Sequence, residues 1–135
     1  MATLTDAQRA FIHDNPYTAV LTTIRPDGSP HSTVVWLDTD GDDVVFNTAQ
    51  GRAKERHVKS NPNVAMIVVD PSNAFKWVSI SGKAKLETEG GREMIDRLSH
   101  KYQGKDYPSE WMGPGEVRVT GRIHVDKVDS TGFDS

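Results

Sequence analysis

The stretch WVSISGKAKL at residues 77–86 decides the fold class, because polar and less polar side chains alternate along its whole length. Successive side chains of a strand point to opposite faces, so the stretch predicts a strand with one buried face. Residues 64–69, VAMIVV, are instead apolar on both faces, which predicts burial on both sides, in a barrel wall or at a subunit interface. Gly82 and Gly121 fall inside expected strands, where glycine usually marks a bulge or a sharp bend.

The remaining pattern predicts a mainly β domain with flanking helices, spanning residues 1–135 as a single unit. Thr5-Asp6-Ala7-Gln8 fits a capping box at the start of a first helix. We expect a solvated turn at residues 38–42 and a loose tail at residues 130–135. Six strands joined mostly by hairpins predict a small antiparallel barrel, with strands at residues 17–24, 31–37, 43–48, 64–69, 77–86 and 117–125.

Composition excludes several classes of protein. The net charge of −3 gives no overall basic field for nucleic acid, so we expect no nucleic-acid partner. The chain has no cysteine, which removes disulfides, thiolate metal sites and cysteine nucleophiles. No segment approaches the roughly 20 apolar residues of a membrane span, and the first residues lack a signal-peptide pattern. A cytoplasmic protein is therefore expected.

The segment TAQGRAKERHVK at residues 48–59 indicates an anion site. It follows an apolar strand and turns through Gly51 into a short helix, which places Arg52 and Lys54 in the first helical turn. Cations are disfavoured at that end of a helix unless an anion lies among them, and free N–H groups there bind phosphate. The alternative is a solvated basic helix face.

Other constellations give no catalytic residue. The five histidines lack metal spacing, no G-x-S-x-G elbow is present, and the aspartates near residue 40 do not fit a calcium loop, so no metal site is expected. Trp36 lies on one face of a strand and either lines a site or fills the core. Trp77 is expected to contact the substrate or a partner subunit, and Trp111 to act as a lid or an anchor.

Taken in order along the chain, these segments resemble the split β-barrel flavin-binding superfamily typified by pyridoxamine 5′-phosphate oxidase. Within it the chain is most similar to the branch that uses the deazaflavin coenzyme F420. The matching segments are DGSPH at 27–31, VVW at 34–36, FNT at 46–48, GRAK at 51–54, RHV at 56–58, NPNVA at 61–65 and VSISGKA at 78–84.

The resemblance implies a six-stranded antiparallel split β-barrel and a homodimer with two cofactor sites in grooves between the subunits. It implies that Arg52 and Lys54 hold the cofactor phosphate, and that the strand from Ser32 to Trp36 forms the wall for the tricyclic ring. With Trp77 added, the expected cofactor contacts are Ser32, Val34, Val35, Trp36, Asn47, Thr48, Gln50, Gly51, Arg52, Ala53, Lys54 and Trp77.

The implied activity is hydride transfer from reduced coenzyme F420 to a small unsaturated substrate such as a quinone or an enone. The alternatives are an FMN-dependent oxidase or reductase of the same fold, and a non-catalytic cofactor-binding or carrier protein. The cofactor carries the chemistry in either enzyme, so no catalytic side chain is required. The anionic tail of the deazaflavin favours a basic exit, for which we expect Arg56, Lys59 or Lys76.

Overall fold

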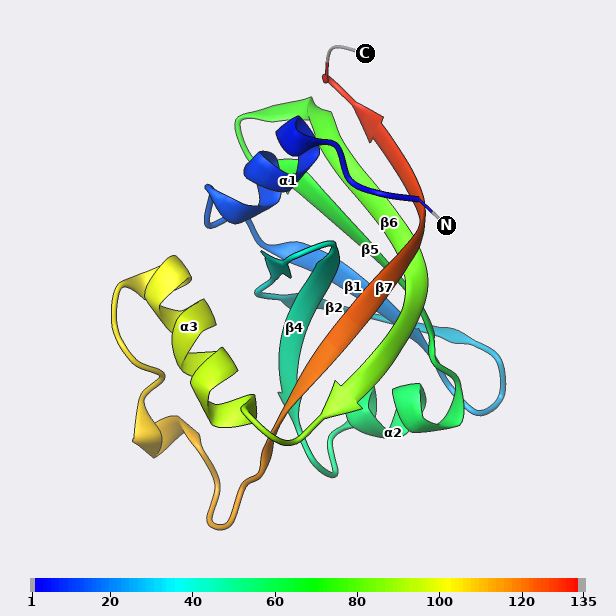
Figure 1. Ribbon diagram of the computed structural model, residues 1–135. Coiled ribbons are helices and arrows are strands. Elements are labelled where there is room, and N and C mark those ends of the chain that lie inside the picture. Colours follow the sequence, from blue (N-terminus) through cyan, green and yellow to red (C-terminus); the bar gives the residue numbers. More distant parts are fainter. Residues whose placement is uncertain (1, 134–135) are drawn as a thin grey trace.

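The structure is a computed structural model and describes residues 2–133. Within these residues, seven strands form one antiparallel sheet in the order β2-β1-β5-β6-β7-β4-β3 (Figure 1). The strands are β1 (Ala19–Ile24), β2 (Pro30–Val35), β3 (Asp38–Asp40), β4 (Asp43–Ala49), β5 (Asn63–Asp70), β6 (Asn73–Glu87) and β7 (Arg118–Thr131). The helices are α1 (Asp6–His13), α2 (Ala53–Ser60), α3 (Gly91–Gln103) and the short 3₁₀ helix η1 (Ser109–Trp111).

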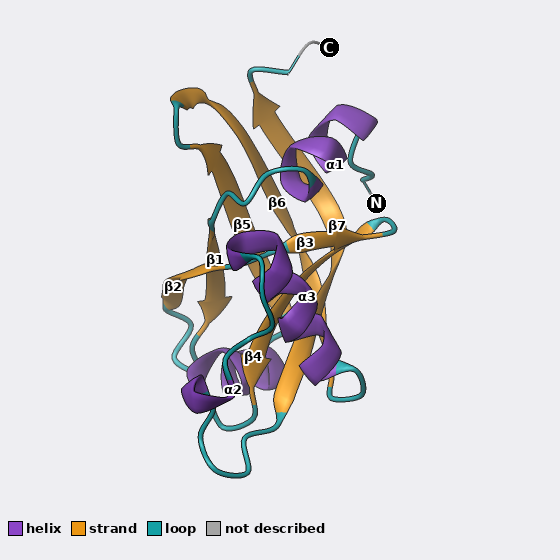
Figure 2. Ribbon diagram, turned by 90° about the vertical axis from the view of Figure 1, so that its left-hand side faces the viewer, coloured by secondary structure: helices purple, strands orange, loops and turns teal. Residues whose placement is uncertain are grey.

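The long strands β6 and β7 bend the sheet into the expected split barrel (Figures 1 and 2). The register of β6 against β7 shifts between Ser81 and Gly82, so the predicted bulge is present. A Cβ on Gly82 would collide with the backbone carbonyl of His124, and a Cβ on Gly121 would collide with the ring of Phe46. Both glycines are therefore required by close packing inside the barrel.

The hydrophobic core lies on the concave face of the sheet and is closed at one end by α1. Phe11 and Ile12 of α1 are buried there with Leu21, Phe46 and Ile123. The predicted capping box starts α1, since the Gln8 N–H donates to Thr5 Oγ1 (3.1 Å) and the Thr5 N–H donates to Gln8 Oε1 (2.9 Å). None of the helices within residues 2–133 combines the length and apolarity that crossing a membrane requires.

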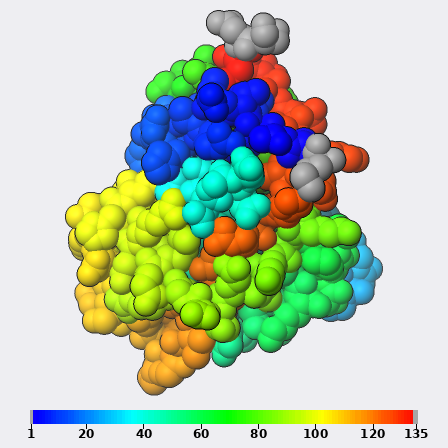
Figure 3. Space-filling view, in the orientation of Figure 1, coloured from blue at the N-terminus to red at the C-terminus, as the bar shows by residue number. Residues whose placement is uncertain are grey.

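Two local expectations were wrong. The expected solvated turn at residues 38–42 instead contains strand β3. Asp38 is buried there, and its carboxylate lies near His13 Nδ1 (2.8 Å), an Arg97 nitrogen (3.2 Å) and Lys101 Nζ (3.8 Å). The space-filling view shows β3, coloured cyan, between α1 and α3 (Figure 3). The expected tail is also partly ordered, since β7 runs to Thr131 and Phe133 packs on Phe11 with ring centroids 5.2 Å apart. Residues 134–135 of that tail lie outside the described residues.

Strand β5 is buried on one face only in the single chain, so the barrel core covers one of its two apolar faces and burial of the other at a subunit interface stays a prediction. Val64, Met66 and Val68 point into the core, whereas Ile67 and Val69 point outward and stay partly or fully exposed. Neighbouring outward side chains extend this apolar area, which we call the outer face. The outer face comprises Val20 of β1, Val34 of β2, Ala65, Ile67 and Val69 of β5, and Trp77 of β6.

Candidate functional site

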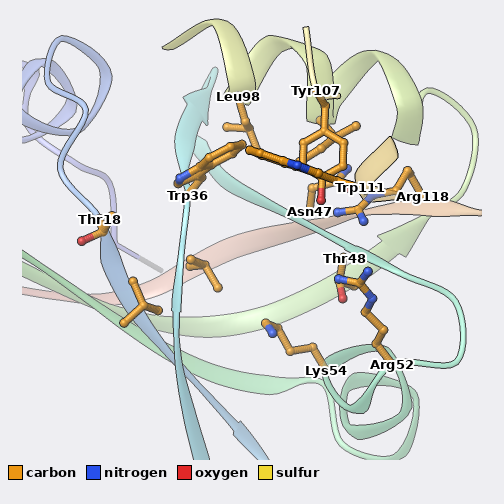
Figure 4. Close-up of a pocket in the computed structure, with 13 residues that line it drawn as sticks. Thr18, Trp36, Asn47, Thr48, Arg52, Lys54, Leu98, Tyr107, Trp111 and Arg118 are labelled. Carbon is orange, nitrogen blue, oxygen red and sulfur yellow. Dashed lines mark hydrogen bonds between the residues drawn. The ribbon is translucent and has the colours of Figure 1, made fainter. Parts of the chain in front are cut away.

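A cavity of about 300 Å³ lies where the end of β2 approaches β4, the start of α2 and the inner side of α3 (Figure 4). Arg52 and Lys54 lie on one side of the cavity, the cationic corner, and the opposite wall is aromatic and apolar. Arg118 lies between the two, with its guanidinium carbon 5.2 Å from the ring centroid of Tyr107. The lining residues are Thr18, Val34, Val35, Trp36, Asn47, Thr48, Arg52, Lys54, Ile95, Leu98, Tyr107, Trp111 and Arg118.

The cationic corner is built by the strand, turn and helix that the sequence predicts. Strand β4 ends at Ala49, the chain turns through Gly51 with φ of 85°, and α2 begins at Ala53. Arg52 is the N-cap residue, and no side chain caps the helix there. The first N–H groups of α2 therefore remain available to an anion beside the Lys54 ammonium group.

Arg118 brings a third cation to this corner from the start of β7. Its side chain is buried, and its Nε donates to Asn47 Oδ1 (2.8 Å). Glu116 joins the two arginines, because its Oε2 accepts from Arg118 Nη1 (3.0 Å) and its Oε1 accepts from Arg52 Nη2 (2.9 Å). Asn47 is fixed in turn by donating its Nδ2 to the carbonyl of Gly91 (2.9 Å). The arrangement is therefore rigid around two guanidinium groups.

Burial and neighbouring charges shift two groups at this corner. Burial lowers the pKa of Lys54, and the positive charges of Arg52 and Arg118 lower it further. Burial alone would raise the pKa of Glu116, but the Arg118 hydrogen bond and the charge of Arg52 lower it below its usual value. The unliganded corner thus disfavours the Lys54 ammonium group, and a bound anion would favour it.

Thr48 supplies an independent sign that a polar ligand belongs here. Its Oγ1 is buried and has no hydrogen-bond partner within residues 2–133. Thr48 lines the same cavity as Arg52 and Lys54 (Figure 4). Buried hydroxyl groups normally have a partner, so a ligand group at this corner would satisfy an atom that the chain leaves unpaired.

The opposite wall carries three aromatic side chains that face the cavity. Trp36 packs edge-to-face against Tyr107 at 6.3 Å, and Tyr107 packs edge-to-face against Trp111 at 5.5 Å. Behind the wall, Tyr102 stacks on Trp36 with centroids 5.3 Å apart and an interplanar angle of 12°. The Tyr102 hydroxyl donates to the Tyr17 carbonyl (2.6 Å), which holds the stack in place. A planar ring has rigid apolar surfaces to pack against here.

The structure brings together seven of the twelve residues that the sequence predicts for the site. They are Val34, Val35, Trp36, Asn47, Thr48, Arg52 and Lys54.

The other five predicted residues do not line this cavity. Ser32 points outward from β2, where its Oγ lies 2.8 Å from Thr22 Oγ1. Gln50 and Gly51 form the exposed turn before α2, and Ala53 is the first residue of that helix. Trp77 lies at the far end of β6, on the outer face.

Of the three residues expected at a basic exit, Lys76 lies elsewhere, with its ammonium group 5.1 Å from the ring centroid of Phe133. Arg56 donates to the Gly51 carbonyl, and Lys59 pairs with Glu55 at 2.8 Å. Neither helix residue lines the cavity, and Lys76 is no part of it.

Sequence reasoning missed Arg118 and Tyr107. The alternating sequence VRVTGRIHV at residues 117–125 predicts that Val117 faces inward and Arg118 outward, yet Val117 is 43% exposed and Arg118 is buried. The local pattern therefore gave no signal for Arg118. Tyr107 gave no signal, because it lies in an irregular loop that is placed by tertiary contacts, such as the bond from its N–H to Asp96 Oδ1 (2.9 Å) and its packing against Trp36.

Comparison with known proteins gives consistent findings. The sequence model of a family described as pyridoxamine 5′-phosphate oxidase matches residues 4–130. A pyridoxine/pyridoxamine 5′-phosphate oxidase from Rubrobacter xylanophilus is 33% identical over 88 residues, which are 64% of this chain and 37% of that protein. The match thus spans little more than a third of that relative.

Two solved structures share the fold over most of both chains. An F420 reductase superposes with a TM-score of 0.77 at 26% identity, covering 89% of this chain and 94% of that one. A conserved hypothetical protein from Mycobacterium tuberculosis superposes with a TM-score of 0.75 at 24% identity, covering 95% and 84%.

Proposed function

The chain belongs to the pyridoxamine 5′-phosphate oxidase family, and on that premise we propose that it is an oxidoreductase that uses reduced coenzyme F420. The substrate is a small unsaturated compound such as a quinone or an enone. When bound, the coenzyme supplies a hydride and the chain supplies its position and surroundings. The likeness to an F420 reductase over 89% of the chain supports this cofactor over others.

The observation that carries the proposal is the pairing of a cationic corner with an aromatic wall in one cavity. Arg52, Lys54 and Arg118 offer charged hydrogen bonds to a phosphate, and the unpaired Thr48 hydroxyl adds a fourth donor. Trp36 and Tyr107 lie across the cavity, as Figure 4 shows, where a planar ring attached to that phosphate would pack. A phosphorylated tricyclic cofactor needs both features at once.

The protein's own contribution is orientation and exclusion of water. The Trp36 ring is held by its stack on Tyr102, so the wall keeps its position before any ligand arrives. Ile95 and Leu98 of α3 make the floor of the cavity apolar. Holding a cofactor and a substrate together in such a site lowers the entropic part of the barrier without any nucleophile.

We further propose that two copies of the chain associate through the outer face. Val34 is 67% exposed and belongs both to the cavity lining and to the outer face. A second copy packed on Val20 and Ile67 would therefore border the cavity, which makes the site a groove between subunits. Trp77 would lie within that interface, consistent with the partner contact expected of it.

An FMN-dependent oxidase is the second candidate, because the matched family and the relative from Rubrobacter xylanophilus are both named pyridoxamine 5′-phosphate oxidases. The aromatic wall serves either ring, so the two candidates differ at the phosphate and beyond it.

Turnover tests the proposed activity. Reduced F420 is mixed anaerobically with a panel of quinones and enones. We expect it to be oxidised at least tenfold faster with the protein than without it, which is far below the usual rate enhancement of an enzyme. The absorbance of oxidised F420 measures the rate. Binding of F420 without oxidation by any acceptor would instead identify a carrier protein, and turnover supported only by FMN would identify the second candidate.

Affinity for F420 is expected to fall as the pH rises above neutrality. An anion favours the Lys54 ammonium group, so binding is strongest while Lys54 is protonated and weakens as the pH passes through its lowered pKa toward the usual 10.5. Titrations between pH 7 and about 10 measure this slope, and Lys54→Met is the control. That variant should bind weakly at every pH with a flatter profile. An equally steep profile in Lys54→Met would assign the effect to another group.

A further inference from the structure

The cationic corner already contains an anion that belongs to the chain. The Glu116 carboxylate places one oxygen 2.9 Å from Arg52 Nη2 and the other 3.0 Å from Arg118 Nη1. The side chains of Glu116 and Arg118 are only 11% and 5% exposed, so water screens this contact poorly. The two arginines are therefore partly neutralised before any ligand binds.

Lys54 differs from the two arginines, because it makes no ion pair with any carboxylate in the described part of the chain, residues 2–133. Three cations face one carboxylate, so the corner has two uncompensated positive charges rather than three. The hydrogen bond from Arg118 and the charge of Arg52 keep the pKa of Glu116 low, and the carboxylate stays ionised at neutral pH. Any phosphate at this corner shares the arginines with a fixed negative charge.

We propose that Glu116 tunes the corner against doubly charged phosphate, because its repulsion lowers the affinity for a phosphomonoester more than the affinity for a singly charged phosphodiester. A phosphomonoester carries about −1.5 to −2 charges at pH 7, and its second charge would meet the repulsion of Glu116. A diester can accept from Lys54, from the first N–H groups of α2 and from the remaining N–H groups of the arginines while the arginines keep their internal partner. Glu116 is thus a specificity-determining residue.

This inference rests on the proposed cofactor site and sharpens its choice of cofactor. Coenzyme F420 holds its phosphate as a diester, whereas FMN holds it as a monoester. Glu116 therefore reduces the advantage that its second charge gives FMN at a cationic corner, before any contact with the deazaflavin tail is considered.

The first test uses the wild-type protein and two ligands that share one ring. FMN and its methyl phosphodiester differ only in the charge and ester of the phosphate, and fluorescence titration gives both dissociation constants. The uncompensated cations attract the second charge of FMN and Glu116 repels it, so the two ligands are expected to bind within about threefold of each other. FMN binding about tenfold or more tightly than its methyl ester would overturn the inference and leave the cofactor site standing. If neither flavin nor F420 binds, both proposals are wrong.

The second test removes the charge of Glu116. In Glu116→Gln, FMN is expected to bind about tenfold more tightly while the affinity for the methyl ester changes less than about threefold. Glu110→Gln, an exposed residue of η1, makes the same charge change and should alter neither affinity. A purely structural role for Glu116 would weaken both ligands together. Thermal unfolding of each variant checks that the fold persists, and the wild-type comparison decides the inference should Glu116→Gln not fold.

Discussion

Alanine in place of Lys54 is expected to weaken F420 binding by about 2–3 kcal/mol, and alanine in place of Arg52 by about 1.5–2 kcal/mol, the usual scale of charged hydrogen bonds. Lys54 has the larger effect because it is half-buried and free of internal carboxylates within residues 2–133, whereas Arg52 is half-exposed and shares Glu116. Fluorescence titration of the purified variants measures both losses.

The stability of these variants should hardly change. Burial and neighbouring cations already disfavour the charged form of Lys54, so its removal costs the folded state little. The Arg52 side chain in the ion pair with Glu116 is 50% exposed, and exposed ion pairs contribute about 0–1 kcal/mol to the free energy of unfolding. Lys83→Ala, an exposed lysine of β6, is the matched control and should bind F420 as the wild type does. A variant at Lys54 or Arg52 that unfolds but keeps wild-type affinity would show that these cations are structural.

Aspartate in place of Ile67 is expected to convert the protein from a dimer to a monomer. Ile67 lies at the middle of the outer face, paired in register with Val20 of β1 and Ser79 of β6. Burying an unpaired carboxylate at a twofold interface costs about 3–5 kcal/mol, enough to raise the dimer dissociation constant by roughly 10²-fold or more. Sedimentation velocity at micromolar concentration measures the change.

Loss of the dimer in Ile67→Asp should also lower the affinity for the cofactor, since Val34 belongs both to the outer face and to the cavity lining. Ala7→Asp is the control, because Ala7 is exposed on α1 and that helix packs on the opposite side of the sheet through Phe11. A wild-type protein that sediments as a monomer while binding cofactor tightly would remove the shared groove and leave a site made by one chain.

The fold was predictable from sequence wherever one face of an element is buried and the other is exposed to solvent. Residues 77–86 alternate cleanly, and β6 forms over them with Val78 and Ile80 buried. The strand predicted over residues 117–125 is present in β7, but its alternation fails at the start, because Arg118, Val119 and Thr120 are all buried in succession. The prediction failed for β3, since the charge of Asp38 suggested solvent and only its distant partners allow burial.

The candidate site was predictable as far as its parts are adjacent in sequence. The turn at Gly51 and the start of α2 reveal Arg52 and Lys54, because a helix N-terminus is a local feature. The contact between Arg52 and Glu116 joins residues 64 positions apart, and no local pattern encodes it. Tyr107 reaches the cavity through the tertiary contacts of its loop. Pairings of this kind depend on tertiary structure and lie beyond sequence patterns.

A parallel titration tests most directly whether one cavity holds the phosphate and ring of F420. The purified apoprotein is titrated with F420 and with FMN in the same buffer, and fluorescence reports each dissociation constant at low and high salt. We predict saturable binding of both, with F420 tighter and more weakened by salt, because its tail adds anions near a cationic corner. Tight, salt-insensitive binding of FMN with no binding of F420 would contradict the account.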